Sequence, residues 1–429
     1  MTEAAHGAYK RRLLWREHPQ TNRYYPNDLR REKAQVLELV GQWDEEEAVL
    51  NENLRCAVEL GDQALIAKSE YELGGVLYLK GANAQALSLY QQAYDRYRER
   101  SDAAGIGLVA GSLGCVYREL GDFTRAMECF QEQLRIARQE SDSAGMSRSY
   151  GYLGIIHCLQ GQFGEAMGYF RQKLELVEGL ADQEAIGATV GNMGNVYKML
   201  GDEQKALKCY DRQLEIARRL GDRRSIGVSV GNSGVIHNDR GDCQKAIVSF
   251  RTFLEMASGL GDRRGVGIAA ANLGIAYKRV GDFANSEKYY DLAIATGREL
   301  NAKQYLCRYL SDKADLFFRL GRMDEAENLI REALGMAEQM GDQSDIFSCR
   351  AISARLGAAS GKEDSIQVLE QLLQEAEDEW QKAELHYDLY RATASTAHRG
   401  EALRLYRAML EEKPRAEYRE RVSELETGE

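Results

Sequence analysis

Residues 191–222 read GNMGNVYKMLGDEQKALKCYDRQLEIARRLGD, and the architecture of most of the chain follows from this stretch. Its internal break, Gly201-Asp202, and its end, Gly221-Asp222, lie twenty residues apart. Glycine readily adopts the left-handed backbone conformation that ends a helix, and aspartate accepts hydrogen bonds from the free N–H groups that begin the next helix. The stretch therefore predicts two short helices that are joined and bounded by tight turns.

This pattern recurs along the chain with a period of forty residues. The glycines that mark it are Gly41, Gly81, Gly121, Gly161, Gly201, Gly241, Gly281, Gly321 and Gly361. A second break, usually Gly-Asp, falls midway, at residues 61–62, 101–102, 141–142, 181–182, 221–222, 261–262 and 341–342. A unit of this length cannot bury its own apolar face and must stack on copies of itself. We therefore predict an all-α fold, an α-solenoid of about ten antiparallel helix pairs.

Each half of the repeat has its own apolar signature with helical spacing. In the second helix, apolar or small residues recur at i, i+4, i+8 and i+11, as in Ala126, Phe130, Leu134 and Ala137. In the first helix, a Leu-Gly pair is followed three residues later by an aromatic residue, as in Leu113-Gly114 with Tyr117 and Leu273-Gly274 with Tyr277. We call the first helix of each pair helix A and the second helix B.

A helix pair with Leu-Gly-x-x-Tyr in A and Ala-x-x-x-Phe/Tyr in B resembles the tetratricopeptide repeat family. Residues 62 to about 340 carry this resemblance. The stretches 191–197 and 271–277 are similar to the long-repeat subgroup found in Pins-type adaptors, kinesin light chains and bacterial tetratricopeptide sensor proteins. Here the repeat has forty residues and ends in Gly-Asp, whereas the usual unit of the family is shorter and often closes with proline.

The two ends of the chain depart from the repeat. Residues 1–27 are basic and form either an N-terminal arm or a cap, residues 28–361 form the repeat array, and residues 362–429 form degenerate C-terminal repeats with a capping helix. Terminal repeats are atypical because one of their faces meets water. We expect residues 411–429, which are mostly charged, to end the chain as an exposed helix.

Composition and motifs argue against catalysis, metal binding and a membrane location. The eight cysteines have no Cys-x-x-Cys spacing, which favours reduced, buried thiols over a metal or disulfide framework. Glycines near residues 105, 227 and 267 lie inside predicted helices, whereas a phosphate cradle needs a strand-to-helix turn. No apolar run reaches the roughly 18 residues of a membrane span. We expect a cytoplasmic, non-catalytic protein without cofactor or metal.

The most specific candidate site is a polar strip on the A helices. The residue before the Leu-Gly position reads Glu72, Ser112, Tyr152, Asn192, Asn232, Asn272 and Asp312. Asparagine is a mediocre helix former, so packing alone gives little reason to use it three times. The family resemblance implies that the A helices line a concave surface and that this position contacts the backbone of an extended partner peptide. The alternative is that each amide only bonds a neighbouring helix.

The spacing of helices suits such a contact. Packed helices lie roughly 8–10 Å apart, and an extended chain advances about 3.3 Å per residue, so successive asparagines would meet about every third residue of a bound strand. In four repeats the residue immediately before the strip position is a glycine. The lack of a side chain there indicates either close packing between helices or room for a ligand backbone. The four residues are Gly111, Gly151, Gly191 and Gly231.

Several cationic and polar residues extend the candidate site. Asn195, Arg118, Lys198 and Lys278 continue the same face by one or two turns. Two A helices begin with arginine pairs, which form either a basic rim or ordinary surface charge. These are Arg223, Arg224, Arg263 and Arg264. A functional rim would select a partner segment that carries carboxylates, whereas the net charge of -11 disfavours nucleic acid.

Two classes of function remain open from the sequence. The first is a binding scaffold that holds an extended, acidic protein or peptide segment on the concave surface. The second is a sensory or regulatory subunit that controls an effector enzyme on another chain, such as a protease, cyclase or kinase. The sequence contains no recognisable effector motif of its own, so we prefer the scaffold.

Overall fold

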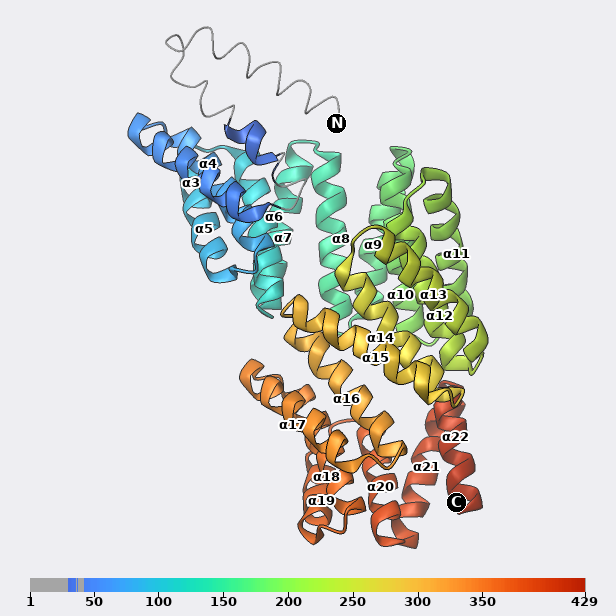
Figure 1. Cartoon of the computed structure of the whole chain (residues 1–429). Coiled ribbons are helices and arrows are strands. Elements are labelled where there is room, and N and C mark those ends of the chain that lie inside the picture. Colours follow the sequence, from blue (N-terminus) through green and yellow to red (C-terminus); the bar gives the residue numbers. More distant parts are fainter. Residues whose placement is uncertain (1–29, 36, 38–41, 429) are drawn as a thin grey trace. The chain divides into compact units, whose positions relative to one another are not determined.

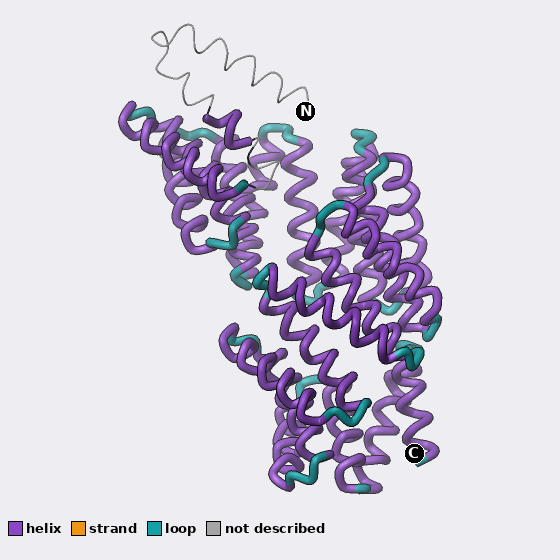
Figure 2. The backbone as a smooth tube through the Cα atoms, in the orientation of Figure 1, coloured by secondary structure: helices purple, strands orange, loops and turns teal. Residues whose placement is uncertain are grey.

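A computed structural model describes residues 30–35, 37 and 42–428, and all regular secondary structure in these ranges is helical (Figures 1 and 2). The predicted arm or cap, residues 1–27, lies outside the described residues. The chain divides after Asp182 into two compact units, which we call unit 1 and unit 2. The predicted all-α solenoid of helix pairs is confirmed.

Unit 1 contains helices of seventeen or eighteen residues that alternate between the B and A types. They are α3 (Trp43–Leu60), α4 (Gln63–Leu79), α5 (Asn83–Glu99), α6 (Ala103–Glu119), α7 (Phe123–Gln139), α8 (Ser143–Leu159) and α9 (Phe163–Gly179). The even-numbered helices carry the Leu-Gly signature and are the A helices. Consecutive helices pack against each other throughout this series.

Unit 2 continues the alternation and ends in shorter helices. Its members are α10 (Gln183–Met199), α11 (Glu203–Leu220), α12 (Arg223–Arg240), α13 (Cys243–Gly259), α14 (Arg263–Arg279), α15 (Phe283–Glu299), α16 (Lys303–Arg319), α17 (Met323–Met340), α18 (Gln343–Ala359), α19 (Glu363–Glu375), α20 (Glu379–Thr393), α21 (Thr396–Glu412) and α22 (Ala416–Thr427). Again each helix packs on the next one in the chain.

The breaks between helices work as their residue types predict. Gly221 has a φ of 69°, in the left-handed region, and Asp222 caps α12 by accepting hydrogen bonds from the backbone N–H groups of Arg224 and Ser225 at 3.0 and 3.1 Å. At four midway breaks a residue other than glycine takes the same conformation, with φ between 48° and 55°. These are Ser101, Ser141, Ala181 and Asn301. The position in the repeat therefore imposes the turn even where glycine is missing.

The Leu-Gly signature is a packing requirement between the two helices of a pair. A Cβ atom at Gly114 would lie 2.6 Å from the ring of Phe130, and one at Gly274 would lie 2.7 Å from the ring of Tyr290. Both rings are fully buried. Glycine in helix A therefore makes room for the large aromatic residue of helix B. The aromatic ring of helix B and the glycine of helix A are therefore a complementary pair in the core.

The glycines that precede the polar strip have the same explanation. A Cβ atom at Gly111 or Gly191 would lie within 2.5 Å of a glutamine side chain of the paired B helix, Gln133 or Gln213. At Gly231 the neighbour is the ring of Phe253, at 2.8 Å. Side chains of the paired B helix thus occupy the space beside these three glycines.

The C-terminal end of the chain is more ordered than we expected. Residues 411–429 were predicted to form an exposed helix, but α22 buries Tyr418 and Leu425 against the preceding helix pair. It also contacts α12, and its residue Ala416 lies beside the turn at Gly241. The expectation was wrong because the charged residues conceal an apolar face that unit 2 covers. As a result, α22 takes part in the site described next.

Candidate functional site

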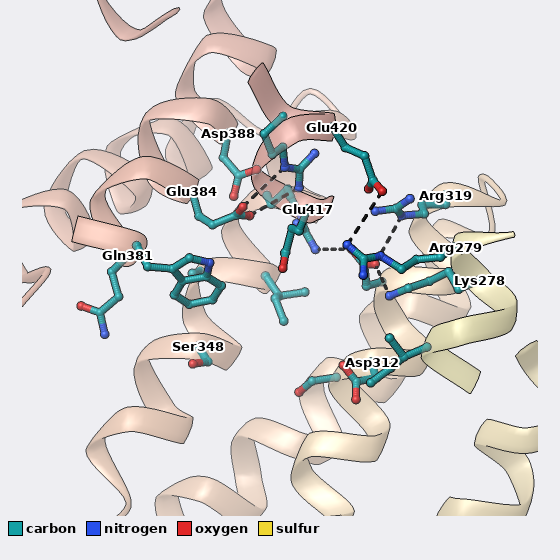
Figure 3. Close-up of a pocket in the computed structure, with 18 of the residues that line it drawn as sticks. Lys278, Arg279, Asp312, Arg319, Ser348, Gln381, Glu384, Asp388, Glu417 and Glu420 are labelled. Atoms are coloured by element: carbon teal, nitrogen blue, oxygen red, sulfur yellow. Dashed lines mark hydrogen bonds and ion pairs between the residues drawn. The ribbon is translucent and has the colours of Figure 1, made fainter. Parts of the chain in front are cut away.

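The A helices of unit 2 line a cavity of about 480 Å³. We call the surface that the A helices of a unit form around such a cavity its inner face. Five A helices contribute to the wall of this cavity, namely α12, α14, α16, α18 and α20, together with α22 and Phe250 of α13. Figure 3 shows Glu417 and Glu420 of α22 among the lining residues. This volume falls within the range of small-molecule and side-chain pockets, roughly 300–1,000 Å³. The A helices recur every forty residues up to α18. Stacking of the repeats therefore brings residues at equivalent positions of successive A helices onto one wall of the cavity.

Asp315 is the centre of an ion network on this wall. Its carboxylate contacts Lys278 of α14 and Arg355 of α18, each at 2.8 Å, and Arg319 at 3.4 Å. Burial alone would raise the pKa of Asp315, but the three cations outweigh burial and hold the pKa well below its usual range. Asp315 is therefore ionised, and it ties three successive A helices together.

A second ion cluster joins α20 to α22. Arg421 lies 3.4 Å from the carboxylate of Glu384 and 3.1 Å from that of Glu424. Burial disfavours the charged form of Glu384, but Arg421 and the hydroxyl of Tyr406 outweigh this effect and lower its pKa. Across the cavity, Arg279 of α14 lies 3.8 Å from Glu420 of α22. These contacts hold α22 over the cavity.

Four carboxylates of the cavity stand outside these ion pairs: Asp239, Asp312, Asp388 and Glu417. Asp388 is only 6% exposed, and its Oδ1 atom has no hydrogen-bond partner among the described residues. Burial raises the pKa of Asp388 to about 7 and that of Asp312 to about 6. The Nε atom of Arg355 likewise has no partner within the described part of the chain. An unsatisfied buried polar atom costs free energy, which a bound polar group would recover.

The charges that line the cavity give it an acidic balance. Seven lining residues are acidic and five are basic. Figure 3 shows Glu384 and Asp388 on one side of the cavity and Lys278, Arg279 and Arg319 on the other. Aromatic residues also contribute to the wall, and one of them, Trp380, is 44% exposed. The cavity therefore combines acidic groups with an accessible aromatic surface.

The three asparagines of the predicted strip have different surroundings. Each is half-buried on its A helix. Asn272 lines the cavity, as does Lys278. Asn232 donates a hydrogen bond to the Oδ1 atom of Asn195 at 3.3 Å, and the same oxygen accepts from the hydroxyl of Tyr210 at 2.9 Å. The hydrogen bond between Asn232 and Asn195 thus links the amides of two successive repeats, whereas Asn272 faces the cavity.

Three of the four arginines in the predicted basic rim have partners within unit 2. Arg224 lies 3.5 Å from Asp262, Arg263 forms a two-pronged pair with Glu299, and Arg264 donates to the hydroxyl of Tyr305. Arg223 remains exposed beside Gly259. Lys198 is half-buried, and burial lowers its pKa. Two of these arginine contacts link successive repeats and the pair of Arg263 with Glu299 joins the helices of one repeat, so they favour a structural role for the rim over recognition of an acidic partner.

The remaining predicted residues, Arg118 and Tyr152, belong to unit 1. Arg118 lies 2.5 Å from Glu119, and Tyr152 stacks on Phe130 with ring centroids 4.7 Å apart. Tyr152 also lines a cavity of about 620 Å³ on the A helices of unit 1. Three further tyrosines share this cavity, and its charged residues are Arg31, Glu46 and Glu72. Unit 1 therefore has an inner cavity of its own, with a different chemistry.

The residues that dominate the cavity of unit 2 were missed by the sequence analysis. Asp315 and Arg355 follow the polar strip by three positions, forty residues apart, in the register of Asn195. Their repeats lack the Asn-Leu-Gly signature that defines the strip, so the strip alone does not indicate them. Following the i+3 register into the degenerate repeats would have found both residues. No sequence signal places α22 over the cavity.

Within the described residues, no group of three or more His, Cys, Asp or Glu side chains is placed to hold a metal ion. None of the helices in the described ranges combines the length and the apolar character that a bilayer-spanning helix needs.

Comparisons with known proteins agree with this architecture. A comparison with curated proteins finds no match. Among solved structures, a Rap protein complexed with competence and sporulation factor superimposes with a TM-score of 0.57 and 17% identity, over 84% of this chain and 99% of that one. The quorum sensor NprR from B. thuringiensis gives 0.57 and 13%, over 79% and 99%. These likenesses show the fold.

A third similar structure is a signal transduction ATPase with numerous domains, a protein with a tetratricopeptide repeat sensor from Pyrococcus horikoshii. It matches with a TM-score of 0.56 and 16% identity over 83% of this chain. The chain spans about half of that protein, 53% of its length. In the sequence itself, the tetratricopeptide repeat model matches residues 106–178, 185–259 and 266–339, which together exceed half of the chain. The chain therefore belongs to the tetratricopeptide repeat family.

Proposed function

We propose that this protein is a non-catalytic binding scaffold that holds an extended polypeptide segment on the inner face of unit 2. The observation that carries the proposal is the cavity itself, because Asn272 of the polar strip and Asp388 line it together, and the buried Oδ1 atom of Asp388 has no hydrogen-bond partner among the described residues. A scaffold that only supported its neighbours would gain nothing from an unsatisfied buried group, which costs about 1–3 kcal/mol.

The amides of the strip suit a polypeptide backbone. A carboxamide offers both a donor and an acceptor, as a peptide group does. Asn192, Asn232 and Asn272 are half-buried, so each side chain is held by its helix while part of it stays accessible. The partner segment proposed from the sequence was acidic. The paired arginines of the rim and the acidic balance of the cavity argue against that charge, so we no longer propose it.

The test uses a library of random acetylated heptapeptides that is selected on the intact chain. We expect selected peptides to bind, and the triple variant Asn192→Ala, Asn232→Ala, Asn272→Ala to weaken their binding about 100-fold, because each lost hydrogen bond contributes about 1 kcal/mol. The control is Asn328→Ala, an exposed asparagine on the B helix α17. Calorimetric titration measures affinity, and circular dichroism checks the helical content. Failure to select any peptide would refute the proposal.

A regulatory subunit is the second candidate function. Its support is the position of α22, which contributes Glu417, Glu420 and Arg421 to the cavity wall, so a ligand there bears directly on the C-terminal helix. Among the similar structures are a Rap protein bound to competence and sporulation factor and the quorum sensor NprR. In this case a selected peptide would change the small-angle scattering of the protein. Identical scattering curves with and without the peptide would leave only the scaffold.

A further inference from the structure

We propose that the cavity of unit 2 is a specificity pocket for one Lys or Arg side chain of the bound segment, whose charged end lies against Asp388. This inference rests on the proposed function, because it needs a polypeptide on the inner face. It adds the chemistry by which a partner is chosen.

The first argument is the distribution of ion partners. Among the cavity residues, Arg355 is paired with Asp315, Arg421 with Glu384, and Arg279 with Glu420. The cavity has two more acidic than basic residues, and the carboxylate of Asp388 forms none of these pairs. An incoming ammonium or guanidinium group would supply the hydrogen-bond donor that Oδ1 of Asp388 lacks and would offset the acidic balance of the cavity. An incoming carboxylate would add repulsion at the same place.

The second argument is burial. Asp388 lines the cavity and is 94% buried, so a ligand must bring its charge to this carboxylate on a long stem. Lys and Arg carry such stems, and their methylene groups pack well against apolar surface. Apolar residues line the same cavity, among them Phe347, Ile352 and Leu385. An N-terminal amine has no stem of this kind, which is why we assign the pocket to a side chain.

The third argument is the aromatic residue of the wall. Trp380 is the second residue of α20, the helix that carries Asp388, and 44% of its surface is exposed. Cations are attracted electrostatically to the face of an indole ring. An exposed tryptophan and a buried carboxylate of one helix therefore line the same cavity, and both favour a cation.

Asn272 connects this pocket to the polar strip. It lines the same cavity as Asp388, from the A helix α14. A segment whose backbone meets Asn272 therefore passes the cavity, and a side chain of that segment has access to it. The strip would hold the backbone of any sequence, whereas the pocket would select one basic residue.

The test compares peptides that differ in one charge. From the selected acetylated heptapeptides, which have no free N-terminal amine, we expect strong enrichment of Lys or Arg at one position. Replacing that Arg by citrulline, which is neutral and nearly the same shape, should weaken binding about 10- to 100-fold, the size of a charge-assisted hydrogen bond. In the Asp388→Asn protein, the Arg and citrulline peptides should bind about equally.

The matched control is Glu370→Gln, which removes an exposed carboxylate from the B helix α19 outside the cavity and should leave the discrimination intact. Thermal melting checks that Asp388→Asn folds. If peptides bind without enrichment of a basic residue, the pocket is refuted while the scaffold stands. If Asp388→Asn still discriminates Arg from citrulline, the assignment to Asp388 is refuted. If no peptide binds, both proposals fall.

Discussion

Unit 1 and unit 2 are built from the same helix pairs, yet their inner faces differ in chemistry. The cavity of unit 1 is lined by Tyr71, Tyr78, Tyr90 and Tyr152 and has three charged residues. The cavity of unit 2 has twelve charged residues, most of them in ion pairs that connect successive repeats. Because packing depends on the other faces of each A helix, the inner face is free to vary. Repetition of a fold therefore does not imply repetition of a site.

Among substitutions that should affect the two units differently, we expect the largest change in the free energy of unfolding at Asp315. Replacing Asp315 with Ala leaves Lys278, Arg319 and Arg355 without their shared carboxylate, and we expect a loss of about 3–5 kcal/mol in the free energy of unfolding. The corresponding change in unit 1, Glu72→Ala, removes one pair, with Arg31 at 2.9 Å, and should cost roughly 1–2 kcal/mol. Urea unfolding measures both. Equal losses would mean that the ion networks do not distinguish the units.

A smaller effect on the free energy of unfolding should depend on pH and arise from Asp388 in unit 2. The pKa of Asp388 is raised by burial from 3.8 to about 7, so the folded protein binds this proton more tightly than the unfolded chain does. Its contribution to stability is present below pH 4 and is lost as the pH rises to 7. Facing groups are Arg355 of α18, Glu384 of α20, Arg421 of α22 and Asp315 of α16.

Asparagine at this position cannot titrate, so the Asp388→Asn variant should gain stability relative to the natural protein as the pH rises. From pH 4 to pH 8 we expect the difference in the free energy of unfolding to grow by on the order of 2–4 kcal/mol. Urea unfolding at the two pH values checks this. A difference that stays constant would show that the carboxylate of Asp388 has already found a partner.

The smallest effect should be equal in the two units, because it concerns the shared core. Gly114→Ala in unit 1 and Gly274→Ala in unit 2 each place a methyl group against a buried ring, and both should cost about 1–3 kcal/mol. The controls are Gly168→Ala on α9 and Gly335→Ala on α17, where no atom lies within 4 Å of the added carbon. They should gain up to about 1 kcal/mol from helix propensity. Thermal unfolding of the four variants reports the order, and unequal losses at Gly114 and Gly274 would break the equivalence of the cores.

Local residue patterns explain why the fold was predictable and the site less so. Turns at Gly221 and the packing of Gly114 on Phe130 depend on residues of one helix pair, so a single repeat reveals them. The strip was found because its asparagines share a register with the core. Asp388, by contrast, lies in α20, where the repeat has degenerated, and its importance comes from the lack of a partner in three dimensions.

The amino-acid sequence by itself determined the helix pairs, their boundaries and their stacking, because these depend on contacts between residues at most about forty positions apart that recur at every repeat. Only the tertiary structure decided which charges meet. Glu420 of α22 pairs with Arg279 of α14, which lies 141 positions earlier in the chain. Such a contact follows from the path of the whole unit rather than from any local propensity. Whether a buried carboxylate is paired or available for a ligand is therefore a property of the assembled solenoid.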